Sequence, residues 1–426
     1  MATQVGLGQA VRHVRLASSR ASRGDVHESL REHMLAPSGA KDDKATRELL
    51  ADLDGGSRHV VLSGTAEQIA RLVKIAAEDK DAPRAPLIDF MLVDEASQMD
   101  VAHAMVALTA LAPGASLVVV GDDLQMPPIH PVDPPDGAAH LVGSIYDFYR
   151  LYRTGVPETG ILPTMLDVNY RSNAEIVGFF RDAGYGRDLR SANTGLRIRL
   201  GPSTAAPPDV DSILDPDEPL VAVVHDDAFS SQRNEAEAAF VAGLVRELYG
   251  RMYSLERPDT LLDGDEFFRE GVGVVTPHRA QQAAILERLD AVMPPEVDRS
   301  AMAKAVDTVE RFQGQQKAAM IASFGIGDPD QISAEEEFLF GLNRFNVIVS
   351  RARAKMIVVV SRGMADHLPR ELAVLRGSKL LKNFVGRHLP STASAWIPDL
   401  GRCEIRRAAH AVPTDLTRRV SVAAAE

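Results

Sequence analysis

Short apolar runs rich in β-branched residues alternate with helix-like stretches through most of this chain of 426 residues. The predicted strands cover residues 59–62, 88–93, 117–120, 220–224, 273–275, 318–323 and 356–360. The predicted helices cover residues 66–77, 175–180, 234–248 and 280–289, the last of which follows a Thr-Pro start signal. Because this alternation is typical of helices packed on parallel sheets, the sequence predicts an α/β fold.

Length and local breaks predict how the chain is divided. A chain of this length is long enough for two or three domains. Residues 127–137 carry five prolines and predict a loop, residues 201–219 predict a surface excursion, and the main boundary is expected near residues 155–164. The predicted segments are a basic, partly helical segment at 1–58, a first domain at 59–160, a second domain at 161–390 and a peripheral tail at 391–426.

Composition excludes several classes of protein. The chain is 45% hydrophobic and 25% charged, which is typical of a packed globular protein and not of a disordered or fibrous one. Its formal net charge of −12 means that any contact with nucleic acid must come from a local basic groove. With one cysteine, Cys403, the chain cannot form an internal disulfide or a thiolate metal cluster, which favours a reducing compartment.

Localisation is predicted to be cytoplasmic. The apolar runs are far shorter than the about 20 residues that a bilayer span needs, and no secretory signal is evident. The first acidic residue is Asp25, after Arg12, Arg15, Arg20 and Arg23 in a Ser-rich stretch, which superficially matches an organellar transit peptide. The alternative interpretation is a basic, partly helical segment.

Two adjacent carboxylates follow the predicted strand at residues 88–93. Asp94 and Glu95 would lie at the carboxyl edge of a sheet, where ligands bind in open α/β folds. There, Asp94 could hold Mg²⁺ on a triphosphate while Glu95 polarises the attacking water. The alternative is an ordinary helix start, where acidic residues are favoured by the helix dipole.

A second polar turn follows the predicted strand at residues 117–120. Gly121 permits a tight exit from the strand, and Gln125 is an uncharged donor and acceptor that could sense a γ-phosphate. Taken alone, this segment could be simply a polar turn.

Five segments in order resemble the motor core of superfamily 1 helicases, in the branch that contains the nonsense-mediated-decay RNA helicase and its DNA-helicase relatives. They correspond to motifs II to VI: DEASQ at residues 94–98, GDDLQMPP at 121–128, LDVNYRS at 166–172, VDTVERFQGQ at 306–315 and NRFNVIVSRAR at 343–353. The resemblance covers roughly residues 59–363 and implies two RecA-like domains, the first incomplete at its N-terminus. It also implies ATP as substrate, Mg²⁺ as cofactor and single-stranded DNA or RNA as partner.

The resemblance assigns roles to residues of the second domain. ATP binds between the two domains in this family, so Arg171 and Arg351 are expected to face the γ-phosphate, where a guanidinium stabilises charge as the phosphoryl group leaves. Tyr170 is expected to pack at the same cleft. The alternative for Arg351 is a salt bridge at a domain surface.

Motif V is expected to link the nucleotide to the nucleic-acid strand. Gln313 and Gly314 would form a tight turn near the phosphates, and Gln316, where the family often has Glu, would contact the nucleotide. The segment VVTPHRAQ at residues 274–281 is similar to a family segment that touches the strand backbone, which makes Thr276, His278 and Arg279 candidate phosphate contacts. The alternative is a capped junction between a strand and a helix.

The phosphate-binding loop of such motors is missing from the sequence. The loop has the form Gly-x-x-x-x-Gly-Lys-Ser/Thr, and neither Gly-Lys-Ser nor Gly-Lys-Thr occurs anywhere in the chain. The chain is therefore expected to start after motifs I and Ia, with an upstream polypeptide supplying the loop, or else to be a degenerate relative.

Two functional hypotheses follow. The first is an ATP-driven helicase or translocase core, with hydrolysis in the full-length context. The second is a catalytically inactive nucleic-acid-binding or scaffold module that keeps the shape of the motor.

Overall fold

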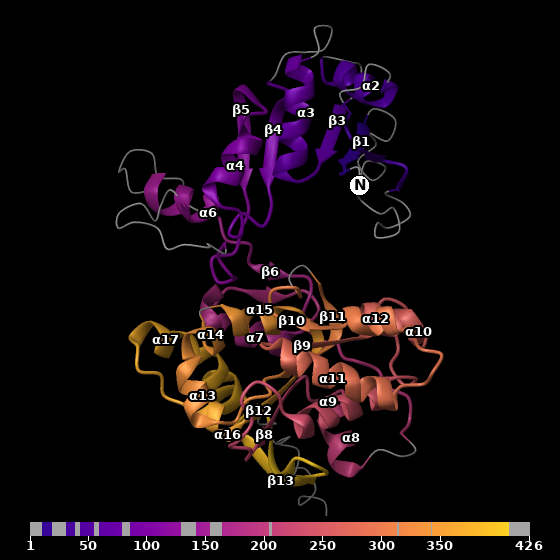
Figure 1. The fold of residues 1–426 in the computed structure, drawn as a ribbon, viewed down its shortest axis with the longest axis vertical. Helices are drawn as coiled ribbons and strands as arrows, with labels where there is room; N and C mark the ends of the chain where they lie inside the picture. Colours follow the sequence, from indigo (N-terminus) through magenta and orange to yellow (C-terminus); the bar gives the residue numbers. More distant parts are fainter. Residues whose placement is uncertain are drawn as a thin grey trace, which may run out of the picture. The chain divides into compact units, whose positions relative to one another are not determined.

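A computed structural model describes residues 11–18, 31–38, 43–54, 59–78, 86–128, 142–153, 164–203, 207–312, 315–341 and 343–408. The chain forms two compact units, Met1–Thr164 and Met165–Glu426 (Figure 1). The division lies at the C-terminal end of the interval in which the sequence predicts a boundary. Among the described helices, none is long and apolar enough to cross a bilayer.

Unit 1 contains two small parallel sheets. One has the strand order β2-β1-β3 and the other is the pair β4-β5. The elements are β1 (Val11–Leu16), β2 (Met34–Leu35), α2 (Lys44–Leu53), β3 (His59–Ser63), α3 (Ala66–Glu78), β4 (Ile88–Val93), α4 (Val101–Leu108), β5 (Leu111–Val119), α6 (Ile145–Asp147) and the π-helical turn η3 (Phe148–Arg153).

One hydrophobic core joins the two sheets of unit 1. Alternate residues of the strands, among them Val14, Leu16, Met91 and Val93, are buried in it together with Leu72 of α3. Helix α4 begins at an Asp100 cap, whose side chain accepts a hydrogen bond from the backbone N–H of His103 at 2.8 Å. Helices α2, α3 and α4 contribute Leu49, Leu72 and Ala104 to the same core.

Unit 2 is built around a sheet of seven strands in the order β10-β9-β11-β12-β8-β14-β13, and β6 and β7 form a separate two-stranded sheet. Every residue of β8, β9 and β11 is buried, as expected for central parallel strands covered on both faces. The hairpin β13-β14 joins β8 in antiparallel pairing.

The elements of unit 2 begin with the β6-β7 pair and end with that hairpin. They are β6 (Val168–Asn169), α7 (Ala174–Phe180), η4 (Arg181–Tyr185), β7 (Arg190–Ser191), α8 (Pro208–Leu214), β8 (Leu220–His225), α9 (Glu235–Leu248), α10 (Gly264–Glu266), η5 (Phe267–Gly271), β9 (Val272–Thr276), α11 (Arg279–Val292), α12 (Arg299–Lys304), β10 (Val306–Thr308), β11 (Lys317–Ser323), α13 (Pro329–Ala334), α14 (Glu336–Leu339), α15 (Arg344–Ser350), β12 (Ala352–Ser361), α16 (Arg362–Asp366), α17 (Leu372–Lys382), η6 (Asn383–His388), β13 (Ser391–Ile397) and β14 (Gly401–Arg407).

The α/β prediction with parallel sheets is confirmed, and each predicted strand and helix is present. The basic segment at 1–58 is more than a helical extension, because β1 lies within it and pairs in parallel with β3. The predicted tail at 391–426 is wrong over its described part. Residues 391–407 form the β13-β14 hairpin, and Cys403 and Ile405 are each 2% exposed.

A buried lysine ties β12 to the turn before β8. The ammonium group of Lys355 donates hydrogen bonds to the carbonyl oxygens of Asp215 at 2.9 Å and Glu218 at 2.6 Å. Burial lowers the pKa of Lys355 to about 7, although the carboxylates of Asp215 and Glu218 act in the opposite direction. An unfolded lysine titrates near 10.4, so between about pH 7 and pH 10 the unfolded chain binds a proton that the folded chain does not.

Lys355→Met is therefore expected to remove a pH dependence of stability. In the wild type this lysine makes the free energy of unfolding rise with pH above about 7, by at most about 1.4 kcal/mol per pH unit. Urea denaturation followed by circular dichroism at pH 7 and pH 9 measures the difference between wild type and variant, with the exposed Lys304→Met as control. A difference that stays constant between the two pH values would contradict the prediction.

Candidate functional site

The turn after β4 presents the two predicted carboxylates at the carboxyl end of the sheet. Asp94 and Glu95 are both exposed, and Asp94 Oδ1 accepts a hydrogen bond from the backbone N–H of Glu95 at 2.9 Å. Glu95 has a φ of 51°, in the left-handed region that residues other than glycine rarely occupy. Its carboxylate accepts a hydrogen bond from Gln98 Nε2 at 2.9 Å, so the turn holds it in one position.

The turn after β5 packs directly against this first turn. The backbone N–H of Ala96 donates to Val120 O at 2.8 Å, and that of Asp122 donates to Ser97 Oγ at 3.3 Å. A Cβ atom at Gly121 would lie 2.9 Å from both Ser97 N and a ring carbon of Tyr146, so only glycine allows this approach. The structure thus brings the two polar turns together, as the carboxyl ends of neighbouring parallel strands.

Gln125 is held within the second turn. Its Nε2 donates to Asp122 Oδ2 at 2.9 Å, and its backbone N–H donates to Asp122 O at 3.1 Å. Asp123, next in the chain to Asp122, pairs with Arg150 at 2.6 Å. Gln125 therefore belongs to the same local structure as Asp94 and Glu95.

An open pocket of about 440 Å³ lies beside the first turn. Its lining includes Thr65 and Glu67 after β3, Asp94, Glu95 and Asp100 after β4, and Pro128 after β5. No group of three or more metal-ligating side chains is present among the described residues. Asp94 suits Mg²⁺ on a nucleotide, because such an ion is bound by one or two carboxylates and completes its shell with phosphate oxygens and water.

In unit 2, the segment that contains Arg171 docks on the start of β12. Arg171 Nη1 donates to Ser350 O at 2.9 Å, and Ser172 Oγ donates to Ala352 O at 2.8 Å. Asn173, the N-cap of α7, donates through Nδ2 to Ala354 O at 2.8 Å. The segments predicted to be motifs IV and VI are therefore neighbours, and Arg171 contacts the residue that precedes Arg351.

Arg351 is almost completely buried. Its side chain is 1% exposed, and Nε donates to Val347 O, one turn earlier, at 3.3 Å. Tyr170, by contrast, is 76% exposed.

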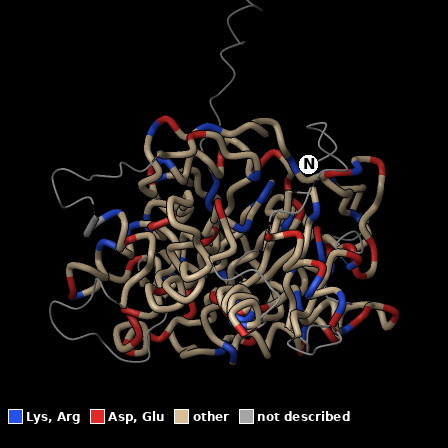
Figure 2. Tube along the Cα trace, turned by 90° about the horizontal axis from the view of Figure 1, so that it is seen from above, with Lys and Arg blue, Asp and Glu red and all other residues tan. Residues whose placement is uncertain are grey.

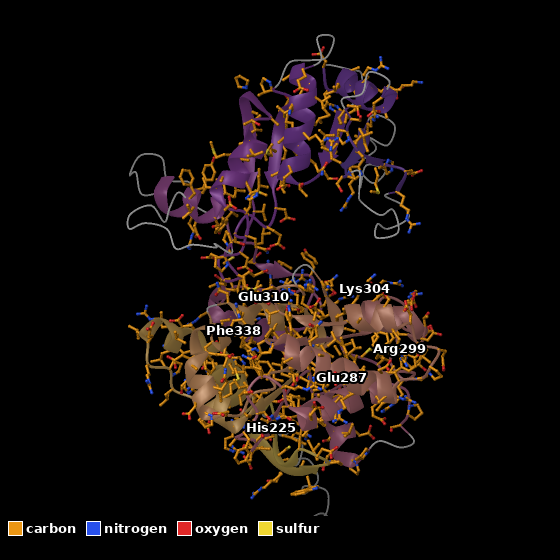
Figure 3. The ribbon with its side chains drawn as sticks, viewed as in Figure 1. His225, Glu287, Arg299, Lys304, Glu310 and Phe338 are labelled. Atoms are coloured by element: carbon orange, nitrogen blue, oxygen red, sulfur yellow. The ribbon has the colours of Figure 1, made fainter. Side chains whose placement is uncertain are left out.

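Arg344, at the other end of α15, connects three predicted motif regions and was not singled out from the sequence. Its guanidinium lies 3.3 Å from the carboxylate of Glu310 and 4.0 Å from the ring centroid of Phe338, both labelled in Figure 3. The ring of Phe338 in turn lies 5.3 Å from that of His278. Glu310 and Arg344 both lie inside motif segments that the sequence shows, but the sequence does not show that these two residues pair.

Of the three predicted phosphate contacts in the segment after β9, only one is exposed at the surface. Thr276 is fully buried and His278 is 8% exposed, whereas Arg279, the first residue of α11, is exposed. His278 Nε2 lies 3.2 Å from Glu335, and burial lowers the pKa of His278, partly offset by that carboxylate. Thr276 and His278 therefore do not fit as surface contacts in this structure.

The remaining predicted residues lie in or beside motif V. Gln313 and Gly314 lie outside the described residues, and Gln316 is exposed just before β11. Charges of both signs are interspersed over the described chain (Figure 2). Arg279 and Gln316 are thus the exposed candidates in this part of unit 2.

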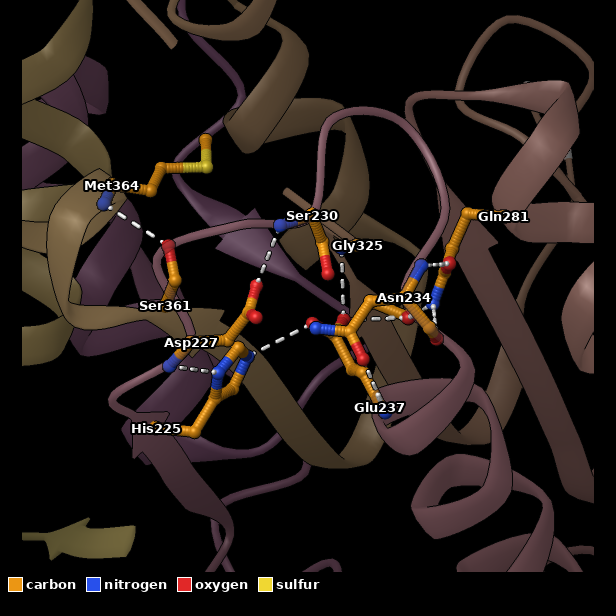
Figure 4. Close-up of polar contacts among 10 residues, drawn as sticks. His225, Asp227, Ser230, Asn234, Glu237, Gln281, Gly325, Ser361 and Met364 are labelled. Atoms are coloured by element: carbon orange, nitrogen blue, oxygen red, sulfur yellow. Dashed lines mark hydrogen bonds and ion pairs between the residues drawn. The ribbon is translucent and has the colours of Figure 1, made fainter. Parts of the chain in front are cut away.

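A buried polar network that the sequence analysis did not identify lies at the carboxyl ends of β8 and β11 (Figure 4). Its centre is Glu237 of α9, which is 0% exposed. The carboxylate of Glu237 receives hydrogen bonds from Ser323 Oγ at 2.7 Å and Gly325 N at 3.0 Å, and it pairs with His225 Nε2 at 2.9 Å. Gln281 extends the network by donating to Ser323 Oγ at 3.0 Å, so its role is structural.

Comparison with known protein families identifies the family of this chain. A family profile described as "AAA domain" matches residues 147–363, just over half of the chain, and a second profile of the same description matches residues 23–131. The chain belongs to the AAA domain family. Within it, the chain is a superfamily 1 helicase-like P-loop protein, as the motif order indicates.

Curated relatives of this AAA domain protein are much longer proteins. The "DNA replication ATP-dependent helicase/nuclease JHS1" of Arabidopsis thaliana is 24% identical over 72% of this chain and 22% of its own length. The mouse "DNA replication ATP-dependent helicase/nuclease DNA2" is 27% identical over 66% of this chain and 25% of its own length. The human "Probable helicase senataxin" is 28% identical over 63% of this chain and 9% of its own length. The chain therefore spans a quarter or less of these relatives.

Proposed function

We propose that this chain is the motor core of an ATP-driven helicase or translocase that acts on single-stranded DNA or RNA. The observation that carries the proposal is the joining of the two polar turns of unit 1, which gathers Asp94, Glu95 and Gln125 at one edge of a parallel sheet. The names of the relatives, which include ATP-dependent helicase/nucleases, support the same class of activity.

In this proposal each residue of unit 1 has one task. Glu95, fixed by Gln98, accepts a proton from the attacking water, and Gln125 orients that water or senses the γ-phosphate. Asp94 would hold Mg²⁺, which neutralises charge on the phosphate oxygens when it is bound with ATP. These roles need an exposed edge, and Asp94 and Glu95 are exposed.

The residues of unit 2 contribute positive charge and strand contacts. Arg171 and Arg351 would stabilise charge on the departing phosphoryl group. Arg279 would contact the phosphate backbone of the strand, and Gln316 the nucleotide. The phosphate-binding loop would come from polypeptide outside these 426 residues, because the sequence contains no Gly-Lys-Ser or Gly-Lys-Thr.

The decisive experiment measures ATP hydrolysis by the chain joined to a segment that carries the phosphate loop. Turnover is expected to depend on Mg²⁺ and to rise when single-stranded DNA or single-stranded RNA is added, and the two nucleic acids are tested separately. Turnover that neither nucleic acid stimulates would count against a motor.

A non-catalytic nucleic-acid-binding module is the second candidate, and the missing phosphate loop favours it. This candidate predicts that the 426-residue chain binds a labelled single strand in a salt-dependent manner but does not bind ATP. Tight ATP binding by the chain itself, measured by calorimetry, would exclude it.

Arg279→Ala is expected to weaken binding of a single strand and to reduce the slope of log affinity against log salt by about 0.7, the value for one lost phosphate contact. Fluorescence anisotropy with a labelled oligonucleotide at several salt concentrations measures both. Arg288→Ala is the matched control, since Arg288 lies on the same helix and pairs with Glu235 at 2.9 Å. Equal salt slopes in the two variants would remove Arg279 from the strand-binding site.

A further inference from the structure

Helix α17 buries one side in unit 2 and turns its other side outward (Figure 1). Its buried residues are Val374, Gly377, Ser378 and Leu381. Because side chains three or four residues apart share one face of a helix, Leu372, Arg376 and Lys379 lie together on the face opposite these four. Leu372 is 63% exposed, and Arg376 and Lys379 are exposed as well.

The two cations of this outward face have no acidic partner. Neither Arg376 nor Lys379 forms an ion pair with any residue that the structure describes. Arg233, by comparison, lies 2.5 Å from the carboxylate of Glu235 and 2.6 Å from that of Glu287. The charges of Arg376 and Lys379 are therefore available to an acidic group from outside the chain.

The segment around these cations is basic although the chain as a whole is acidic. Residues 370–387 contain five Lys and Arg and one acidic residue, Glu371, in a chain with a formal net charge of −12. Cations in the last turn of a helix are favoured by the helix dipole, which accounts for Lys379 and Lys382. Arg376 lies outside that last turn, so the dipole does not account for it.

Exposed leucines accompany the basic residues. Leu368, four residues before Leu372 in the chain, is 72% exposed. Leu375 and Leu380 are half-buried and flank the outward face of α17. A single exposed leucine is ordinary, whereas two beside unpaired cations form a surface that is both apolar and basic. Covering these leucines removes apolar area from water, which is favourable.

This combination of groups distinguishes between classes of partner. A nucleic acid would pair its phosphates with the cations, but its bases stack on aromatic rings, and α17 contains no aromatic residue. A bilayer surface needs a broad apolar face to insert, and the apolar side of α17 is already buried in unit 2. An acidic protein segment with apolar residues uses both the cations and the leucines.

We propose that the outward face of α17, formed by Leu372, Arg376 and Lys379, is a docking surface for an acidic segment of a partner protein. Carboxylates of the segment pair with the two cations, and an apolar residue of the segment covers Leu372. The proposal goes beyond the proposed function, because none of these three residues takes part in the ATP chemistry or in the strand contact.

The test selects binders to the complete chain from a library of random peptides of about 12 residues. A counter-selection uses the double variant Arg376→Glu, Lys379→Glu. Peptides that the wild type retains and the double variant loses are expected to combine Asp or Glu with Leu or Phe, because both kinds of group have a counterpart on α17.

Fluorescence anisotropy with one selected, labelled peptide then measures the contribution of each residue. Arg376→Glu and Lys379→Glu should each weaken binding by about tenfold or more, because like charges would then face each other. Leu372→Ser should weaken it by about fivefold through loss of apolar burial. Arg402→Glu is the matched control, since it reverses the charge of an exposed arginine on β14 and should bind like the wild type.

Four results would overturn the proposal. They are a selection in which the double variant loses no peptide, selected peptides without acidic residues, peptide binding that Arg402→Glu weakens as much as Arg376→Glu does, and binding of a labelled single strand that Arg376→Glu weakens as much as it weakens peptide binding. The last result would assign the outward face of α17 to nucleic acid.

Discussion

Glu237→Ala is expected to lower the free energy of unfolding of unit 2 by about 3–5 kcal/mol, because it leaves several buried polar groups without a hydrogen-bond partner, at about 1–3 kcal/mol each. The substitution leaves His225, Ser323 Oγ and the N–H of Gly325 without their shared acceptor. These groups come from β8 and from the end of β11, so the substitution removes hydrogen bonds that connect two central strands to α9. Hydrogen exchange of the β8 and β11 amides at increasing urea concentrations measures the stability of unit 2 separately from that of unit 1.

Glu235→Ala provides the matched control, two residues earlier on α9. Glu235 is exposed and pairs with Arg233 and Arg288 at the surface, where ion pairs contribute about 0–1 kcal/mol. The two variants remove the same chemical group from the same helical turn and differ in burial. If both lowered stability equally, the structural role assigned to the network would be wrong.

Glu95→Gln is expected to reduce ATP turnover by about 10²–10⁴-fold in the chain supplied with a phosphate loop, the range for loss of a general base. The substitution keeps the size of the side chain and its contact with Gln98, and it removes the ability to accept a proton. ATP binding should remain, so the loss should appear in kcat and not in KM. A coupled phosphate-release assay with single-stranded nucleic acid measures both constants.

Glu67→Gln is the control for this experiment. Glu67 lines the same pocket as Glu95 but lies at the start of α3, away from the turns after β4 and β5. Its replacement changes the charge of the pocket without removing the proposed base. Wild-type turnover in Glu95→Gln would exclude Glu95 from catalysis.

The strands that flank the candidate site could be predicted because their signals are local. Residues 88–93 form an apolar run that ends in Asp94 and Glu95, and the structure has β4 at Ile88–Val93. The structure brings the turns after β4 and β5 together because neighbouring parallel strands end at the same edge of a sheet. The hairpin β13-β14 was missed, since the run Ser391–Ile397 contains small and polar residues whose strand conformation depends on pairing.

Burial was the property that the sequence did not reveal. Arg351 and Thr276 are types of residue that usually lie at the surface, yet each is almost completely enclosed. Glu237 and Gln281 look like ordinary helix residues, because nothing near them in the chain shows that Ser323 and Gly325 will meet them. Such contacts join residues far apart in sequence.

The sequence alone determined the α/β class, the order of the motif segments and the identity of the carboxylates that end β4, since each depends on residues within a few positions of one another. Tertiary structure alone decided that Arg171 contacts the residue before Arg351, that Arg351 is buried, and that Leu372 of α17 is exposed. These properties depend on which distant segments pack together, and packing energy depends on the three-dimensional neighbours of a side chain and not on its neighbours in sequence.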